Sequence, residues 1–432
     1  MHLAPTRRQQ QLRAELRSYF RSLMPGGPPP ADDPEAQRAL LRRIGADGLL
    51  GLGWPEEYGG RGRGPEEQFV FFDEAYRAGA PVSMVTLNTV GPTLMKYGTD
   101  AQKSFFLPRI LGGDAVFAIG YTEPEAGTDL AALRTRAVRD SAPPPAGPGT
   151  GLGSDSGSGC GSGCGGSWVV DGQKVFTSNA QNADWIWLAC RTDPTAPPHR
   201  GISIILVPTG APGFSWTPIR TVGGLTTTST YYEDVRVPAG NLVGEENAGW
   251  GLITEQLNHE RVALAAIGMQ AEDFFAAALT RARTPDPVTG RRRMDEPWIR
   301  IRAAEAHARL SATRLLNWRL VADVGAGRLA PGDAAGVKFA GTESAVEVYR
   351  MCQEIAGDEA LIRGGSPGAL RASPAGPERS DGTDGTRETD GELERMNRAA
   401  QINTFGGGVS EVQREIVAMT RLGMRGPKRR RT

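Results

Sequence analysis

The chain has 432 residues, in which 49 Lys and Arg residues balance 49 Asp and Glu residues. This length is too great for one small hydrophobic core, so two or three packed domains are expected. The balanced charge excludes a global field that would attract nucleic acid, and four cysteines do not suggest a disulfide framework. No apolar run approaches the roughly 20 residues that span a bilayer, and the N-terminus has no signal-peptide core. We therefore expect a soluble, cytoplasmic protein that binds neither nucleic acid nor membrane.

The hydrophobic pattern changes twice along the chain. Residues 1–113 repeat apolar side chains at three- and four-residue spacing, which is typical of amphipathic helices. Residues 114–240 form short β-rich runs bounded by Gly, Pro and Asp, which predicts a middle antiparallel β-domain. Long helical segments return in residues 241–432. The fold class predicted is therefore an α+β multidomain chain. The runs that suggest strands are 168–178, 185–192, 201–208 and 230–238, together with the apolar run 115–121.

Two segments do not fit any core. Residues 141–167 and 364–391 are low-complexity stretches rich in Gly, Pro, Ser and Asp, which cannot bury enough apolar area to become ordered. We interpret them as mobile surface insertions in the middle and C-terminal domains. Cys160 and Cys164 lie in the first one without a His or acidic cluster beside them, so no metal site is expected there.

The apolar run 115–121 leads into a loop, YTEPEAGTD, that is dense in backbone N–H groups and short hydroxyls. This loop, the segment VVDGQKVFTSNAQNADWIWLACRT, the segment YYEDVRVPAGNLVGEENAGW and the C-terminal GGGVSEVQREIVA occur in this order. The ordered set resembles the landmarks of the acyl-CoA dehydrogenase family, and the resemblance covers almost the whole chain outside the two insertions. It implies an N-terminal helical domain, a middle β-domain and a C-terminal four-helix bundle domain, with FAD between the last two.

The resemblance also assigns cofactor contacts. The first loop would hold the isoalloxazine, Phe176 would lie against the flavin ring, and Ser178 would bind near its reactive nitrogen. The segment QEIAG would contact the nucleotide half of FAD. The implied cofactor-binding residues are Tyr121, Thr122, Gly127, Thr128, Phe176, Thr177, Ser178, Gln353, Gly357 and Glu411, and Thr128 would also meet the substrate.

The family's reaction removes two hydrogens from Cα and Cβ of a thioester, which needs a base for the α-proton and a hydride acceptor that only a flavin supplies. Most members carry the base as a Glu near the C-terminus, where this chain has Gly407. A minority branch carries it on an earlier helix directly before an Arg, and Glu260 followed by Arg261 matches that pair. Glu260 is therefore the expected base, with its pKa raised by burial, and Asn258 and Arg261 are expected to bind substrate. The alternative is that Glu260 and Arg261 form a surface ion pair on an amphipathic helix.

A family motif, R-x-x-F-G, which is donated across a subunit interface to the FAD pyrophosphate, is missing from residues 283–307. Its absence suggests that a non-identical subunit supplies the contact. The segments HRGISIILVPTGAPGFSWTPIRTVGG, TYYEDVRVP and NHERVALA resemble one subunit of the actinobacterial steroid side-chain enzymes, which assemble as α2β2 heterotetramers. This similarity implies dehydrogenation of a bulky steroid side-chain acyl-CoA to the trans-2-enoyl-CoA in β-oxidation, with an electron-transfer flavoprotein as acceptor.

Two other functions remain open. The same fold could act as a flavin monooxygenase or oxidase, although a retained Glu260 favours proton abstraction from Cα. Alternatively, Gly407 and the missing Arg motif could mark a non-catalytic scaffold subunit, against which the retained flavin loops argue.

Overall fold

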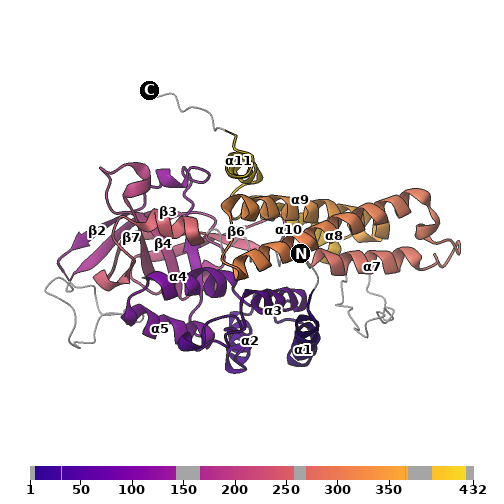
Figure 1. Ribbon diagram of the computed structural model, residues 1–432, viewed down its shortest axis with the longest axis horizontal. Helices are drawn as coiled ribbons and strands as arrows, with labels where there is room; N and C mark the ends of the chain where they lie inside the picture. The colour runs from indigo at the N-terminus through magenta and orange to yellow at the C-terminus, as the bar shows by residue number, and fades with distance from the viewer. Residues whose placement is uncertain are drawn as a thin grey trace.

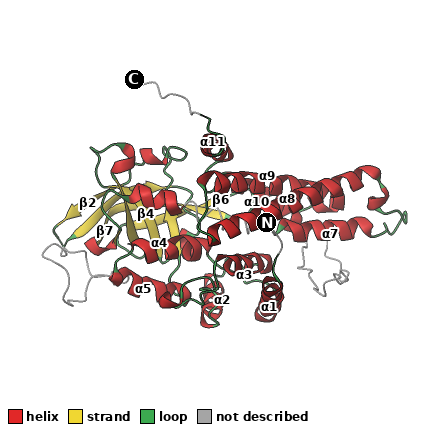
Figure 2. Cartoon of the chain, viewed as in Figure 1, coloured by secondary structure: helices red, strands yellow, loops and turns green. Residues whose placement is uncertain are grey.

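The fold is an α–β–α succession, seen in a computed structural model that describes residues 5–30, 32–142, 166–256, 269–364, 366–367 and 392–424 (Figure 1). The strands form one sheet, and three helices of the C-terminal region, α7, α8 and α9, extend away from it (Figure 2). Helices α4 and α5 lie along one side of the sheet, whereas α1, α2 and α3 lie below the near end of the C-terminal helices. The helical and β-rich patterns of the sequence are confirmed in this order.

The N-terminal region is helical because its apolar stripes are accompanied by clear start signals. Thr6 and Thr99 each begin a capping box, in which the Thr side chain accepts a hydrogen bond from the backbone of the third helical residue, a Gln that reciprocates. A short π-helical segment, Val85–Val90, precedes α4. The helices are α1 (Arg7–Leu23), α2 (Pro34–Ala46), α3 (Pro65–Ala78), α4 (Gly91–Tyr97) and α5 (Asp100–Leu111).

The middle region is a mixed sheet with strand order β6-β7-β3-β2-β4-β5-β8, in which β1 also pairs with β4. The expectation of a purely antiparallel domain is wrong for two pairs, since β1 and β2 run parallel to β4. They do so because a long connection returns the chain to the same end of the sheet. The strands are β1 (Phe117–Gly120), β2 (Arg136–Asp140), β3 (Ser167–Lys174), β4 (Trp185–Arg191), β5 (Ile202–Pro208), β6 (Phe214–Arg220), β7 (Thr226–Pro238) and β8 (Leu242–Val243).

The C-terminal helices pack mainly on one another. Residues 249–256 are helical, and beyond residue 268 the helices are α7 (Ala271–Arg283), α8 (Pro297–Gly325), α9 (Pro331–Ala356), α10 (Glu392–Ala400) and α11 (Ser410–Thr420). One hydrophobic cluster runs from the N-terminal helices through the sheet to Trp318 and Val321 of α8, and a second lies among α7, α8, α9 and α10. Because the first core is continuous, the N-terminal helices and the sheet pack together through one shared hydrophobic cluster.

A buried charge cluster joins α3 to α7. The Arg77 guanidinium lies 2.8 Å from Asp73, 2.9 Å from Glu272 and 2.6 Å from Asp273. Burial by itself lowers the pKa of Arg77, but the surrounding carboxylates outweigh that and hold its pKa well above the ordinary value. The cluster therefore fixes the start of α7 against the N-terminal helices.

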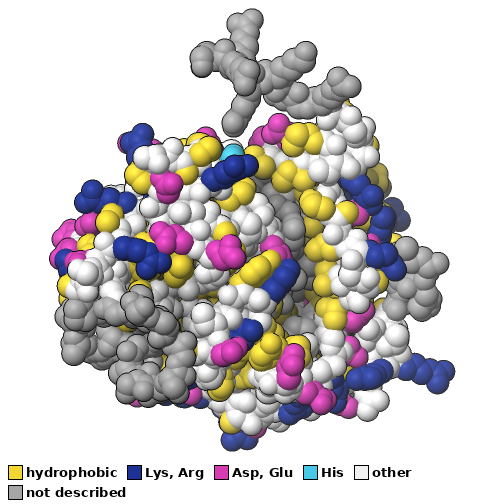
Figure 3. Space-filling model, turned by 60° about the vertical axis from the view of Figure 1, so that its left-hand side comes forward, with side chains coloured by type: hydrophobic (Ala, Val, Ile, Leu, Met, Phe, Trp, Pro, Cys, Tyr) yellow, Lys and Arg dark blue, Asp and Glu magenta, His cyan; other side chains and the backbone are white. Residues whose placement is uncertain are grey.

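The described surface carries both signs of charge. Figure 3 shows acidic and basic side chains intermixed over one face, with hydrophobic side chains gathered beside a central hollow. None of the described helices is long and apolar enough to cross a membrane. Within the same residues, no group of three or more His, Cys, Asp or Glu side chains is placed to hold a metal ion.

Candidate active site

A buried ion pair holds the loop that follows β1. The Lys174 ammonium, at the end of β3, lies 2.8 Å from the Glu123 carboxylate and donates to the Tyr121 carbonyl at 3.1 Å. Glu123 also accepts from the backbone N–H groups of Arg134 and Thr135, at 2.7 and 2.8 Å. Burial raises the pKa of Glu123, but the Lys174 charge and these hydrogen bonds outweigh it and hold that pKa below its ordinary value. The buried Lys174–Glu123 ion pair therefore holds the loop in place.

The same support brings the loop of residues 121–128 beside the loop of residues 175–179. The backbone N–H of Val175 donates to the Thr122 carbonyl at 2.8 Å. A Cβ added to Gly127 would lie 3.7 Å from the Thr122 methyl group, so the loop folds back on itself. Gly127 and Thr128 are exposed, whereas Thr122 is half-buried. The structure therefore brings together most of the residues expected to contact a flavin.

Phe176 is the most conspicuous side chain of this region. It is 62% exposed, although it is large and apolar, and its backbone has φ of 60° in the left-handed region that disfavours side chains. Neither hydrophobic burial nor backbone preference explains an aromatic residue here. An exposed aromatic face at this point is suited to stacking on a planar ligand ring.

The next two residues differ in burial: Thr177 is buried and Ser178 is exposed. Thr177 is buried, its N–H donates to the Thr228 carbonyl at 2.9 Å, and its hydroxyl lies 3.4 Å from that of Thr230. Ser178 is exposed, and its hydroxyl lies 3.3 Å from that of Thr227. Thr177 therefore fixes the loop to β7, while Ser178 presents a hydroxyl beside Phe176.

Tyr121 points inward. Its hydroxyl donates to the side-chain oxygen of Gln256 and accepts from the Trp187 indole at 3.1 Å. The Tyr121 hydroxyl therefore contacts the helix that ends the described segment at residue 256. Gln256 carries no signal in the sequence that would have linked it to Tyr121.

The expected base, Glu260, lies outside the described residues, as do Asn258 and Arg261. The described residues on either side of this segment are firmly held. Gln256 binds Tyr121, and beyond the segment Arg77 donates to the Met269 carbonyl at 3.0 Å. The last described residue before the segment therefore lies beside the loop of residues 121–128, and the first described residue after it contacts α3.

Gln353 and Gly357 are not brought to this cluster within one chain. They lie at the C-terminal end of α9, near the connection between α7 and α8, at the end of the helices that points away from the sheet (Figure 1). The Gln353 amide donates to the Ala360 carbonyl at 3.1 Å. Arg293 donates to two carbonyls of this helix end, and a Cβ added to Gly357 would lie 2.9 Å from its guanidinium.

Gly407 and Glu411 lie at the start of α11. Gly407 has φ of 65°, a conformation that favours glycine, and its carbonyl accepts from the Gln413 amide at 2.9 Å. Glu411 is exposed in the first turn of α11, where the helix dipole favours a negative charge. Neither arrangement identifies a second candidate base.

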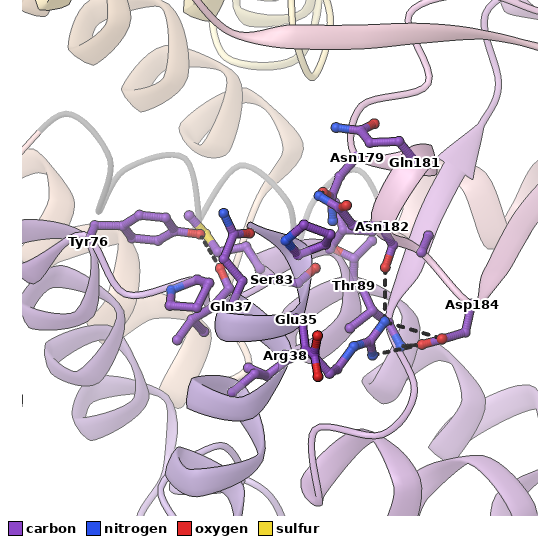
Figure 4. A pocket seen from close by; sticks show the side chains of 18 residues that line it. Glu35, Gln37, Arg38, Tyr76, Ser83, Thr89, Asn179, Gln181, Asn182 and Asp184 are labelled. Carbon is purple, nitrogen blue, oxygen red and sulfur yellow. Dashed lines mark hydrogen bonds and ion pairs between the residues drawn. The ribbon is translucent and has the colours of Figure 1, made fainter. Parts of the chain in front are cut away.

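A cavity of about 720 Å³ opens next to the second loop, between α2, residues 81–89 and residues 179–184. Asn179, which directly follows Ser178, belongs to its wall. Figure 4 shows Tyr76 on one side of the cavity and Asp184 on the other, with Thr89 between them. No sequence pattern indicated this cavity, because its walls come from segments that are far apart in the chain, at residues 34–41, 76–89, 116 and 179–184.

Comparisons with known proteins identify the class to which this arrangement belongs. The models of the N-terminal, middle and C-terminal domains of acyl-CoA dehydrogenases match residues 6–114, 149–235 and 247–422. The chain belongs to the acyl-CoA dehydrogenase family.

Individual relatives cover nearly the full chain. Acyl-CoA dehydrogenase FadE26 of Mycobacterium tuberculosis is 45% identical, over 98% of this chain and 99% of that one. Among solved structures, the Tcur3481-Tcur3483 steroid ACAD is 47% identical with a TM-score of 0.83, covering 99% of this chain and 100% of that chain. The ChsE4-ChsE5 complex from Mycobacterium tuberculosis is 44% identical with a TM-score of 0.82, again covering 99% and 100%.

Proposed function

We propose that this chain is the catalytic subunit of a FAD-dependent acyl-CoA dehydrogenase that converts an acyl-CoA thioester to the trans-2-enoyl-CoA in the cytoplasm. The observation that carries the proposal is the joined pair of loops, in which the Val175 N–H binds the Thr122 carbonyl, the Phe176 ring is exposed, and a buried Lys174–Glu123 pair supports the first loop. These groups fit a planar, hydrogen-bonding cofactor. FAD, when bound, supplies the hydride acceptor that no side chain provides.

The roles of the residues follow from this placement. Phe176 would pack against the isoalloxazine, while Ser178, Thr128 and the backbone at Gly127 would fix its orientation. Glu260 would remove the α-proton, and Asn258 and Arg261 would position the thioester. The role of Glu260 is supported by the described ends of its segment, one at Tyr121 in the flavin loop and the other at Arg77.

The proposal includes a non-identical partner of the same family in an α2β2 assembly. Gln353 and Gly357 lie remote from the flavin loops of their own chain, so a cofactor that they contact would be held mainly by another subunit. The related ChsE4-ChsE5 complex contains two differently named chains. Arg293 caps its own α9, which leaves the pyrophosphate contact of the missing motif to the partner.

The substrate proposed is a bulky steroid side-chain acyl-CoA undergoing β-oxidation, with electrons leaving to an electron-transfer flavoprotein. The similarity to the Tcur3481-Tcur3483 steroid ACAD supports this substrate class. The cavity of about 720 Å³ beside Asn179 is large enough for a bulky ligand and supports it as well.

The decisive experiment compares Glu260→Gln with Glu411→Gln, each in the chain co-expressed with its partner. Flavin absorbance and its bleaching by a steroid side-chain acyl-CoA are recorded for both. We expect both variants to be yellow, bleaching to be lost only in Glu260→Gln, and Glu411→Gln to bleach as the unchanged protein does. Normal bleaching by Glu260→Gln would overturn the assignment of the base.

The same samples test the other functions. A complex that is colourless in every preparation would identify a scaffold subunit. Reduced flavin that is reoxidised faster by oxygen than by an electron-transfer flavoprotein would identify an oxidase or monooxygenase.

A further inference from the structure

We propose that Gln256 is a positioning residue for the flavin loop, the loop of residues 121–128. Through the Tyr121 side chain it ties this loop to the helix of residues 249–256, at the start of the C-terminal region. The inference rests on the proposed function and deepens it, because it names a residue outside the middle domain on which flavin binding and the flavin reduction potential depend.

Three buried side chains form a hydrogen-bonded chain at the start of the flavin loop. The Trp187 indole N–H donates to the Tyr121 hydroxyl oxygen at 3.1 Å, and the Tyr121 hydroxyl donates to the side-chain oxygen of Gln256. An indole can only donate, so the Tyr121 oxygen is the acceptor there and its proton is directed to Gln256. Gln256 is only 1% exposed, and a hydrogen bond in such a buried place is costly to break.

Tyr121 is held at its backbone and at its side chain by different parts of the chain. Its carbonyl accepts from the Lys174 ammonium at 3.1 Å, and the next carbonyl, that of Thr122, accepts from the Val175 N–H at 2.8 Å. These two bonds join the loop to the end of β3 and to the residue that follows it. The contact with Gln256 joins the same loop to the C-terminal region.

The helix of residues 249–256 is itself held in place, so it can position the loop. At its start, Gly249 packs so closely on β5 that an added Cβ would lie 2.9 Å from the backbone of that strand. At its end, Glu255 accepts from the Lys96 ammonium at 2.6 Å and from the Tyr97 hydroxyl, both in α4. The last turn of this helix is therefore attached both to α4 and to the flavin loop.

The position of the loop matters to a flavin because of the N–H groups that the loop presents. Among the described residues, none accepts a hydrogen bond from the backbone N–H of Gly127 or Thr128, so both are available to a ligand. A flavin gains negative charge density when it is reduced, and donors that are already in place stabilise that charge. Loss of the Gln256 contact should therefore weaken FAD binding and also lower the reduction potential of the bound flavin.

The test measures FAD affinity and the reduction potential of the bound flavin in the co-expressed complex. Gln256→Leu and Tyr121→Phe should each weaken FAD binding about tenfold and lower the potential, because each removes the same hydrogen bond. The double variant should also bind FAD about tenfold more weakly than the unchanged complex, and not about a hundredfold, since two residues of one contact do not act additively.

Glu255→Gln, in the same helical turn, is the matched control. It removes the charge of the contact with Lys96 but keeps the side-chain length and an oxygen acceptor, so FAD affinity and potential should not change. If Gln256→Leu does not fold, Tyr121→Phe carries the comparison with this control.

Three results would each overturn the inference: additive losses in the double variant, unchanged affinity and potential in the single variants, or an equal shift in Glu255→Gln. A complex that is colourless without any substitution would instead overturn the proposed function, which keeps the two failures distinct.

Discussion

The Lys174 ammonium and the Glu123 carboxylate are 2.8 Å apart and buried beneath the loop that presents Thr122, Gly127 and Thr128. Neither side chain reaches the surface where a cofactor would lie. Their pairing instead fixes the height and direction of the loop, because Lys174 also binds the Tyr121 carbonyl. The loop geometry therefore depends on a pair that never meets the cofactor.

Replacing Lys174 by Met should destabilise the protein and weaken flavin retention. The change leaves the Glu123 charge buried without its partner, and such a loss costs about 3–5 kcal/mol of the free energy of unfolding. Urea denaturation and the flavin-to-protein absorbance ratio measure the two effects. Arg136→Met, which removes an exposed pair with Asp171, is the matched control and should cost less than about 1 kcal/mol.

The double variant Lys174→Met with Glu123→Leu should recover part of the lost free energy. Removing both charges leaves no uncompensated ion, and replacing a buried pair by apolar groups is often close to neutral. The recovery is only partial, because the backbone N–H groups of Arg134 and Thr135 lose the Glu123 acceptor. A double variant that is less stable than Lys174→Met alone would contradict this account of the pair.

The stability of the protein should depend on Glu123 as the pH falls. Burial raises the pKa of this carboxyl, but Lys174 and the Thr135 hydrogen bonds hold it below the ordinary value of 4.5. A carboxyl with a lowered folded-state pKa contributes stability above the unfolded-state pKa and loses it as the pH falls through the folded-state pKa. The difference in unfolding free energy between the unchanged protein and Glu123→Gln should therefore be constant near pH 7 and shrink below about pH 4.5. Urea titrations at several pH values measure it.

We predict that the Phe176 ring contributes to FAD binding, whereas the backbone conformation of this residue costs stability. With φ of 60°, a glycine fits this position better than any other residue. Phe176→Gly should therefore be about 1–2 kcal/mol more stable than Phe176→Ala, while both bind FAD more weakly than the unchanged chain. Denaturation and equilibrium dialysis of the cofactor measure these effects. Equal stability of the two variants would show that the left-handed conformation is lost on substitution.

The two described cysteines should be inert in the folded protein. Burial raises the pKa of the Cys190 thiol to about 12, with Lys174 opposing and Glu123 reinforcing the rise, and burial raises that of Cys352 as well. A thiol reagent at pH 8 should therefore leave both unlabelled in a Cys160→Ser, Cys164→Ser variant until denaturant is added. Rapid labelling of the folded variant would show that one of the two cores opens.

The sequence predicted the buried strands better than the exposed ones. β4 and β5 are continuous apolar runs, and their bounds were expected within one residue. β6 was not expected, because Pro218 and its exposed polar neighbours are typical of an edge strand, which is where the order of the sheet places it. β2 is short and carries three charged residues, so hydrophobic periodicity gave no signal for it.

Only those parts of the candidate site that are formed by residues close together in the sequence could be predicted. The loops at residues 121–128 and 175–178 could be identified because short stretches there resemble the flavin segments of the acyl-CoA dehydrogenase family. The Lys174–Glu123 pair and the contact between Tyr121 and Gln256 join residues 51 and 135 positions apart, and nothing in the sequence pattern connects them. Whether Glu260 acts as the base stays a prediction.

The π-helical segment Val85–Val90 has a consequence for how this cavity could arise or be lost. A π-helix is wider than an α-helix by one residue per turn, so deleting Asn88 would allow the segment to close into a continuous α-helix with α4. The residues before the deletion would then rotate by about 100° around the axis. The residues after the deletion would keep their places, because Gly91 packs so closely against Trp54 that an added Cβ would lie 2.2 Å from its ring. Deleting Asn88 would therefore shift Val85 relative to Thr89, two residues of the cavity wall, so loss of a single residue would reshape the cavity.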